Sequence, residues 1–248
     1  MSPKKHTLSV IVIAKNEEAR IGRCLASVRF ADEIIVLDNG SVDDTSEIAQ
    51  KHGAVVKTFQ TTDFARLRNE GAKLVGSEWM LYIDADEIVT AQLARSIRSR
   101  KHIYAGYEIH RKNYYLGVLW PRGEWMLRLF KKSAFQTWRG ELHESAIVKG
   151  VVGRLTGDLT HDTHRTLAEM VAKTNEWSET EAALRFNTHH PPITWWRILR
   201  MMASAFWDSY FRQGGWRVGI VGVIESMYQG FSMFVTYAKL WEMQQGKK

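Results

Sequence analysis

The alternation of short apolar runs with helical patterns over the first hundred residues constrains the fold more than any other feature of this sequence. Apolar runs that read as buried strands occupy residues 8–14, 33–37, 54–59 and 79–83. The segments between them place apolar residues at helical spacing, as in Ile21, Leu25 and Val28. Strands that alternate with helices predict an α/β fold with a mostly parallel, doubly wound sheet. In such sheets ligands bind beyond the carboxyl ends of the strands.

Polar residues and one glycine predict where these helices begin and end. Asn16, followed by Glu17 and Glu18, is typical of a helix cap with an acidic first turn. Asp44 and Glu47 have the spacing of a capping box, and Gly53 is placed to end the second helix. A third helix is predicted over residues 64–75.

The pattern changes twice further along the chain. From about residue 104 to residue 159, short segments rich in Tyr, Trp, Ile and Val alternate with glycines, which indicates irregular and antiparallel strands. A helical pattern resumes at Thr166 and continues to Leu184, and the sequence NTHHPP at residues 187–192 is a clear break. Two apolar, aromatic helices are predicted after it. We therefore expect a first domain over residues 1–190 and a C-terminal helical region over residues 191–248.

Charge and cysteine content narrow the classes of partner and compartment. The chain has 34 basic and 27 acidic residues, a net charge of +7, which suits a nucleic acid, an anionic membrane or a phosphorylated substrate. No concentrated basic stripe or recognition module is visible, so we expect no nucleic acid partner. The one cysteine, Cys24, excludes an intramolecular disulfide and favours a reducing compartment. The first residues contain no long apolar stretch, so no secretory signal is expected.

Three carboxylates follow the buried strand in the sequence WMLYIDADEIV, namely Asp84, Asp86 and Glu87. They either form an acidic turn that ends the strand or hold a cation. Asp84 and Asp86 are two residues apart, so an extended backbone would point both side chains the same way. Residues 14–17 and 38–44 fall at the ends of other strands, which favours the cation. Phosphate-binding glycine loops and zinc motifs are absent from the sequence.

Three blocks of sequence together resemble a known family. They read SVIVIAKNEEARIGRCLASV, DEIIVLDNGSVDDT and RNEGAKLVGSEWMLYIDADE, in that order. Their order and spacing are similar to those of inverting glycosyltransferases of family 2, which have the GT-A fold. Further along, LRLFKK, GELHES and LTHDTHRTLAEMVAKTNEWS resemble the branch of that family that builds the core of bacterial lipopolysaccharide. The resemblance implies a GT-A catalytic domain with a small antiparallel β portion and C-terminal amphipathic helices.

The resemblance implies a donor-binding role for several residues. Residues 14–17, with Ala14, Asn16 and Glu17, would form the wall of the nucleoside pocket. Asp38 would contact the base or the ribose, unless it only caps the loop that follows it. The family's Arg-Asn pair falls on two residues, Arg68 and Asn69. The guanidinium of the first could approach the diphosphate. Arg128 would face the donor phosphates or the acceptor.

The same resemblance implies a divalent cation and a catalytic base. Asp86 matches the usual direct ligand of Mg²⁺ or Mn²⁺, while Asp84 matches a residue that more often faces the ribose or donor sugar. His161 matches a histidine that some relatives use as a further metal or phosphate contact; the alternative is a structural histidine. Inverting transfer also needs one carboxylate to accept the acceptor's proton. Glu144 matches the family pattern, with Glu141 as its substitute.

The segment from Trp195 to Trp241 predicts a helical surface that interacts with a membrane interface. Arginines and acidic residues interrupt it too often to leave the ~20 apolar residues of a membrane span. Tryptophans and other apolar residues at helical spacing, mixed with arginines, are instead typical of a helix that lies among anionic lipid headgroups. The alternative is a helical pair that packs on the first domain or forms a homo-oligomer.

The sequence as a whole predicts a metal-dependent inverting glycosyltransferase. Its partners would be a nucleotide-diphospho-sugar donor, with a uridine nucleotide and glucose implied by the branch, and a lipid-linked saccharide acceptor. It would work at the cytoplasmic face of the inner membrane. Two rival functions remain: an inactive GT-A protein that binds nucleotide as a scaffold, and a phosphohydrolase whose motif the sequence DADEI resembles superficially.

Overall fold

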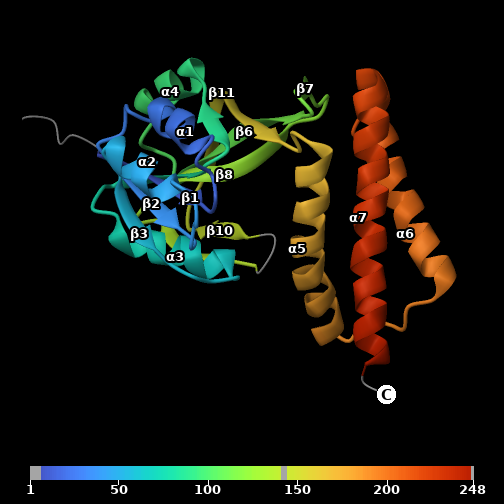
Figure 1. Ribbon diagram of the computed structural model, residues 1–248. Coiled ribbons are helices and arrows are strands. Elements are labelled where there is room, and N and C mark those ends of the chain that lie inside the picture. The colour runs from blue at the N-terminus through green and yellow to red at the C-terminus, as the bar shows by residue number, and fades with distance from the viewer. Residues whose placement is uncertain (1–6, 141–143, 247–248) are drawn as a thin grey trace, which may run out of the picture. The chain divides into compact units, whose positions relative to one another are not determined.

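The computed structural model describes residues 7–140 and 144–246, and the chain divides into two compact units (Figure 1). The first unit contains Met1–Lys112 and Glu124–His161, and the second contains Asn113–Gly123 and Asp162–Lys248. The expected domain boundary between residues 190 and 191 stays a prediction, and the two compact units divide the chain at other positions.

Four parallel strands form one half of the large sheet in the first unit, in the order β3-β2-β1-β4. These strands and the helices between them are β1 (Leu8–Ala14), α1 (Ile21–Ser27), β2 (Glu33–Asp38), α2 (Thr45–Lys51), β3 (Val55–Thr58), α3 (Phe64–Leu74) and β4 (Trp79–Asp84). Every residue of β1 is buried. Val10 and Val12 pack with Leu25 of α1 in one cluster, and Ile11 packs with Leu67 of α3 in the other. The run is apolar except for Ser9, because helices cover both faces of the sheet.

The other half of the sheet is antiparallel and continues from β4 in the order β8-β6-β11-β5. These strands are β5 (Glu87–Val89), β6 (Gly106–Tyr115), β8 (Glu124–Lys131) and β11 (Val152–Thr163). Helix α4 (Ala91–Arg98) packs where Gly157 has a φ of +93°, and a Cβ there would lie 2.3 Å from the amide nitrogen of Leu93. Strands β9 (Phe135–Arg139) and β10 (Ser145–Val148) form a separate two-stranded sheet. The predicted α/β class is confirmed.

One predicted helix start is wrong, and one predicted capping box does not form. Helix α1 begins at Ile21, because Asn16 has a φ of +56° and lies in a loop, where its side chain accepts the amide of Val42. Asp44 does occupy the N-cap position of α2, but its side chain makes no capping bond, and Glu47 pairs with Lys51 instead. The partner of Asn16 lies 26 residues away, which a local pattern cannot reveal.

The second unit is mainly helical, with one helix close to the predicted residues 166–184 and two further long helices after the predicted break. It contains β7 (Val118–Leu119), α5 (Leu167–Asn187), α6 (Trp195–Trp207), the π-helical η1 (Asp208–Arg212), the 3₁₀-helical η2 (Gly215–Val218) and α7 (Gly219–Gln245). The side chain of Thr166 caps α5 by accepting the amide of Glu169 at 3.2 Å. Helix α7 packs against both α5 and α6 (Figure 1).

Within the part of the chain that the structure describes, one segment, Gly215–Gln245, is long and apolar enough to cross a membrane. This differs from the expectation that charges interrupt the whole C-terminal region, because a stretch of 18 residues in this segment holds at most two charged residues. Length and composition alone do not distinguish a span from a helix that packs on a protein surface.

Candidate functional site

The carboxyl ends of three neighbouring strands bring the sequence-predicted residues together. Ala14 of β1 lies opposite Asp38 of β2, and Ile13 of β1 lies opposite Asp84 of β4. Parallel strands end at the same edge of a sheet, so the loops that follow them form one surface. All residues discussed below belong to the first unit.

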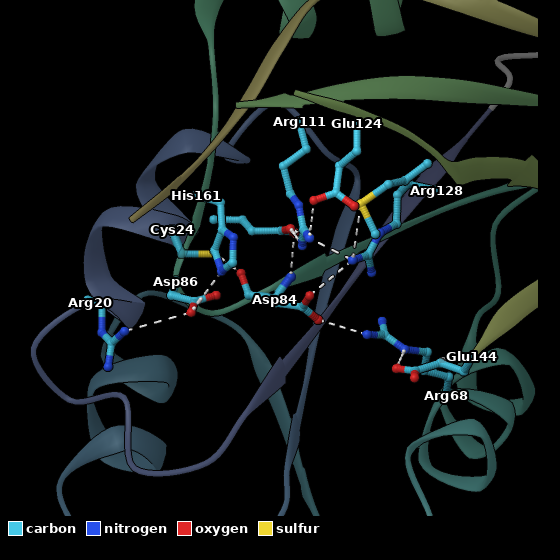
Figure 2. Close-up of polar contacts among 12 residues, drawn as sticks. Arg20, Cys24, Arg68, Asp84, Asp86, Arg111, Glu124, Arg128, Glu144 and His161 are labelled. Atoms are coloured by element: carbon cyan, nitrogen blue, oxygen red, sulfur yellow. Dashed lines mark hydrogen bonds and ion pairs between the residues drawn. The ribbon is translucent and has the colours of Figure 1, made fainter. Parts of the chain in front are cut away.

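Asp84 lies between two buried arginines (Figure 2). Its carboxylate accepts hydrogen bonds from Nη2 of Arg68 at 2.9 Å and from Nη2 of Arg128 at 3.0 Å. Both arginine residues are only 4% exposed. Burial by itself would raise the pKa of Asp84, but Arg128 and Arg68 outweigh it and hold this pKa well below its ordinary value. Asp84 is therefore an ionised counter-ion for two guanidinium groups.

A second carboxylate, Glu87, lies behind Asp84 and is completely buried. It accepts the backbone amide of Asp84 at 2.9 Å and Nη1 of Arg111 at 3.0 Å, and Nη2 of Arg128 lies 3.7 Å away. Arg111 also donates to Glu124 at 2.8 Å, across the β6–β8 register. Glu87 thus holds the turn between the two aspartates, and Arg111 connects that turn to the antiparallel half of the sheet.

Sequence reasoning assigned no role to Arg111 or Glu124, and it treated Glu87 only as part of an acidic run. The one available signal was the continuation of the motif as DADE. The pairing of Arg111 with Glu124 arises from strand register between β6 and β8, which local patterns do not reveal.

Asp86 has different partners from Asp84 (Figure 2). Its Oδ2 atom lies 3.2 Å from Nε2 of His161 and 3.7 Å from Nη1 of Arg20. His161 arrives there because it pairs with Glu87 in the β11–β5 ladder. The expectation that both aspartates point the same way is wrong, because β4 ends at Asp84 and Asp86 lies in a turn.

The pair of Asp86 and His161 offers an oxygen and a nitrogen donor of the kind that a divalent cation accepts. Among the residues that the structure describes, no group of three or more His, Cys, Asp or Glu side chains could hold a metal. A cation at this pair would therefore need further ligands from a substrate or from water. Such a ligand set is typical of Mg²⁺, which proteins usually bind through one or two carboxylates together with phosphate oxygens.

Arg68 connects Asp84 with Glu144. Its Nε atom donates to Oε1 of Glu144 at 2.9 Å, while its Nη2 atom donates to Asp84. The ring of Trp138 lies under the guanidinium, 5.0 Å from Cζ. The substitute base, Glu141, lies outside the described residues.

The side chain of Asn69, the second residue of the Arg-Asn pair, forms hydrogen bonds with the backbone of Trp138. Its side-chain amide donates to the carbonyl of Trp138 at 3.0 Å and accepts the amide of Trp138 at 2.9 Å. Asn69 therefore holds β9 against α3 and supports the position of Trp138 under Arg68. Its predicted contact with the donor stays a prediction.

The residues predicted for the nucleoside pocket form a hydrogen-bonded loop pair. Asp38 is buried and accepts the amide of Ser41 at 2.9 Å and the hydroxyl of Ser46 at 2.5 Å. The amide of Asn16 donates to Ser41 Oγ, and the amide of Glu17 donates to Thr45 Oγ1 at 2.7 Å. These hydrogen bonds connect the loop after β1 to the loop after β2. Asp38 also caps the loop that follows it, which is the alternative role considered for this residue.

Two guanidinium groups retain buried donors. Nη1 of Arg68, and both Nη1 and Nε of Arg128, are buried and have no hydrogen-bond partner in the described residues. A buried donor without a partner is costly, by about 1–3 kcal/mol or more for charged groups. An anion with several oxygens, such as a phosphate, matches donors of this geometry.

Cys24 lies close to these carboxylates but is not a nucleophile. Its Sγ atom is 3.6 Å from the carbonyl oxygen of Asp84. Burial raises the pKa of its thiol well above the ordinary value, and Glu87 and Asp86 raise it further. The sulfur therefore stays protonated and cannot attack a substrate as a thiolate.

The comparison with protein families identifies the class. A sequence profile described as Glycosyl transferase family 2 matches residues 9–147, which cover β1 to β10 and every residue of the site except His161. The chain belongs to glycosyltransferase family 2. The family that the three sequence blocks resembled is thus confirmed.

Individual relatives match nearly the whole chain, with sequence identities below 30%. The lipopolysaccharide core biosynthesis glycosyltransferase LpsC of Rhizobium meliloti is 27% identical over 96% of this chain and 93% of its own length. An uncharacterised glycosyltransferase of Rickettsia typhi is 28% identical over 95% of this chain and 87% of its own length. Among solved structures, glucosyl-3-phosphoglycerate synthase of Mycobacterium tuberculosis is similar over 75% of this chain and 81% of that chain, with 20% identity and a TM-score of 0.45.

Proposed function

We propose that the protein transfers a sugar, with inversion, from a nucleotide-diphospho-sugar to a lipid-anchored saccharide of the lipopolysaccharide core. Membership of glycosyltransferase family 2 and the similarity to LpsC over most of both chains support this proposal. A uridine nucleotide and glucose are the donor components that the sequence resemblance implies. The observation that carries the proposal is the pair of buried arginines, with unsatisfied donors, around Asp84.

The diphosphate of the donor would bind to those arginines. Arg68 and Arg128 present charged N–H groups that phosphate oxygens can accept, and Asp84 holds both guanidinium groups in place before the donor arrives. Transfer builds negative charge on the departing nucleoside diphosphate, and fixed positive groups at that position stabilise it. Ala14, Asn16, Glu17 and Asp38 would line the nucleoside, while Asn69 would support Arg68 through Trp138.

A divalent cation, Mg²⁺ or Mn²⁺, would be held by Asp86 together with His161. Asp84, which the sequence also offered as a ligand, is paired with Arg68 and Arg128. When bound, the cation would neutralise charge on the diphosphate. The donor set fits this cation because it combines a carboxylate with an imidazole and leaves positions for phosphate oxygens. Arg20, which pairs with Glu17 at 2.6 Å and approaches Asp86, would keep the carboxylate oriented.

Glu144 would act as the base. The acceptor hydroxyl attacks the anomeric carbon from the face opposite the nucleotide, the bond from that carbon to the diphosphate oxygen breaks, and the hydroxyl proton passes to the Glu144 carboxylate. Arg68 binds both Glu144 and Asp84, so it would hold the base next to the donor phosphates. A diphosphate that draws Arg68 toward itself would loosen the pair with Glu144 and leave the carboxylate able to accept the proton.

The acceptor determines where the enzyme would work. A lipid-anchored saccharide lies in a bilayer, and the donor nucleotide is a cytoplasmic compound, so the reaction would take place at the cytoplasmic face of the inner membrane. The net charge of +7 agrees with an anionic membrane surface as a partner. The sequence also left open that the protein forms a homo-oligomer.

Calorimetric titration of UDP, with and without Mn²⁺, tests this function. We expect UDP to bind in a cation-dependent way, with GDP and CMP binding more weakly. Asp86→Asn should abolish the cation dependence. The matched control is Asp158→Asn, because Asp158 is a partly exposed aspartate of β11 whose partners are His110 and Lys112 rather than the residues of the site. If no nucleotide binds, the carboxylates are only a strand-ending turn and the transferase proposal is wrong.

A further inference from the structure

The second unit exposes an unusual amount of aromatic and aliphatic surface on α6, η1 and α7. Large apolar side chains that are at least 39% exposed include Trp196, Trp207, Phe211, Met227, Phe234 and Trp241. Soluble proteins rarely leave large apolar patches uncovered unless the patch binds a partner or a membrane. The question is therefore which partner this surface binds.

The exposed residues of α7 lie on one side of the helix. Ile220, Met227, Phe234 and Trp241 follow one another at intervals of seven residues, a spacing that keeps side chains on nearly one line along an α-helix. Ile220 and Trp241 are 21 residues apart, so this line extends for about 32 Å at 1.5 Å per residue. A stripe of this length is too long for a local packing defect.

The opposite side of α7 is held to α5 by polar contacts. The hydroxyl of Tyr228 donates to the carbonyl of Met170 and accepts the hydroxyl of Thr174 at 2.7 Å. Further along, Lys239 donates to the carbonyl of Asn175 at 2.5 Å and pairs with Glu179 at 3.1 Å. Helix α7 therefore has a polar, protein-bound side and an apolar, exposed side.

A buried carboxylate argues against a membrane-spanning α7, despite the composition of this segment. Glu225 is completely buried within the segment that passes the length and composition criterion for a span. Its carboxylate lies 3.0 Å from Nδ1 of His164 and accepts Nε2 of Gln229 at 2.7 Å. A spanning α7 would leave these partners and the α5 contacts, and it would place a carboxylate in hydrocarbon at a large cost. The helix keeps its partners if it lies in the plane of the surface.

Basic residues accompany the apolar ones. Arg200, Arg212 and Arg217 are exposed on α6, η1 and η2. The guanidinium of Arg217 lies 5.0 Å from the ring of Trp216, and that of Arg200 lies 5.7 Å from the ring of Trp196. A tryptophan beside an arginine suits the lipid headgroup region, because the indole ring is partly shielded from water there and the guanidinium can bind lipid phosphate.

We propose that α6, η1, η2 and the exposed side of α7 form a docking surface for a bilayer that contains anionic phospholipids. The two helices lie in the plane of the interface, with their aromatic side chains at the level of the headgroups and their arginines on lipid phosphates. The biological purpose of this surface, to bring the site to a lipid-anchored acceptor, rests on the proposed function. The surface itself rests only on the second unit.

Co-sedimentation of the full chain with lipid vesicles tests the proposal. We expect binding to vesicles of phosphatidylcholine mixed with phosphatidylglycerol, and weak binding to phosphatidylcholine alone. Neutralising all three exposed arginines, as Arg200→Gln, Arg212→Gln and Arg217→Gln together, should weaken binding about a hundredfold, because each arginine contributes about fivefold. Trp207→Ser with Phe211→Ser should weaken it about tenfold or more.

Matched controls come from the first unit. Trp125→Ser and Arg154→Gln change an exposed tryptophan and the arginine beside it, 4.6 Å away, and should leave vesicle binding unchanged. Alkaline carbonate should extract the bound protein, whereas retention would indicate a spanning α7 and overturn the in-plane arrangement. Vesicle binding that is insensitive to the surface variants would overturn the proposal. So would a dimer in light scattering that Trp207→Ser with Phe211→Ser dissociates while no vesicles bind.

The test is independent of catalysis. Vesicle binding can be measured without nucleotide, and nucleotide binding can be measured without vesicles. Loss of the predicted UDP binding together with intact vesicle binding would refute the transferase proposal and leave the docking surface standing. The converse result would refute the surface alone.

Discussion

Replacing Glu87 with glutamine should destabilise the first unit strongly, although Glu87 has no assigned contact with substrate. The side chain is completely buried and its carboxylate accepts the amide of Asp84 and the guanidinium of Arg111. The substitution keeps the size and removes the charge. It leaves Arg111 with a single carboxylate, Glu124, at 2.8 Å.

The size of the effect follows from these contacts. Removing one partner of a buried ion pair costs about 3–5 kcal/mol. The glutamine oxygen can still accept the amide of Asp84, and Arg111 keeps its pair with Glu124, so we expect the free energy of unfolding to fall by about 2–3 kcal/mol. For a unit of this size, that loss lowers the unfolding temperature by about 4–12 °C.

Glu108 provides a matched control on the same sheet. Glu108 also pairs with an arginine, Arg154, at 2.8 Å, but the two side chains are 33% and 62% exposed. An exposed pair contributes only about 0–1 kcal/mol, so Glu108→Gln should shift the unfolding temperature by a few degrees at most.

Thermal unfolding followed by circular dichroism and tryptophan fluorescence compares the two variants. The same samples should be titrated with UDP and Mn²⁺, because a loosened turn between Asp84 and Glu87 should also weaken donor binding. Equal shifts for Glu87→Gln and Glu108→Gln would refute the reasoning, since burial would then not decide the strength of these pairs. A destabilised Glu87→Gln with normal UDP affinity would confine the role of Glu87 to stability.

Two further predictions concern the base and the acid sensitivity of the site. Glu144→Gln should lower the rate of transfer by about 10²–10⁴-fold while UDP affinity is kept, and turnover at the original rate would move the base to Glu141. The pKa of Asp84 is depressed in the folded chain, where burial opposes and Arg128 and Arg68 dominate, so the unfolded chain binds a proton there first as pH falls. Its contribution to stability is complete above about pH 5 and is lost in stronger acid, so Asp84→Asn should flatten the slope of unfolding free energy against pH below about pH 4. An unchanged slope in urea titrations would contradict this assignment.

Part of the site could be predicted from sequence because its residues follow strands. Ala14, Asp38 and Asp84 end three parallel strands, and apolar periodicity is enough to place those strands and their common edge. The three sequence blocks also identified the family, because their order and spacing are properties of the chain itself. The start of helix α5 was predicted at Thr166, and the structure shows that the hydroxyl of this residue accepts a hydrogen bond from the amide of Glu169, only three residues away.

Other parts depended on contacts between distant residues. Asn16 has the composition of a helix cap, yet its side chain binds the loop at Val42 and its backbone adopts a positive φ. Asp84 and Asp86 have different partners because β4 stops between them, and Arg68 and His161 approach them from separate elements.

The sequence by itself determined the α/β class, the family and the acidic residues that end the strands, because these follow from periodicity and from local order along the chain. The tertiary structure alone decided which charges meet. The pairs of Arg68 with Glu144 and of Arg111 with Glu87 join residues 76 and 24 positions apart. Such pairs form only when strand register and helix packing bring side chains together in a buried place, where a guanidinium must find a carboxylate or keep a donor for a substrate.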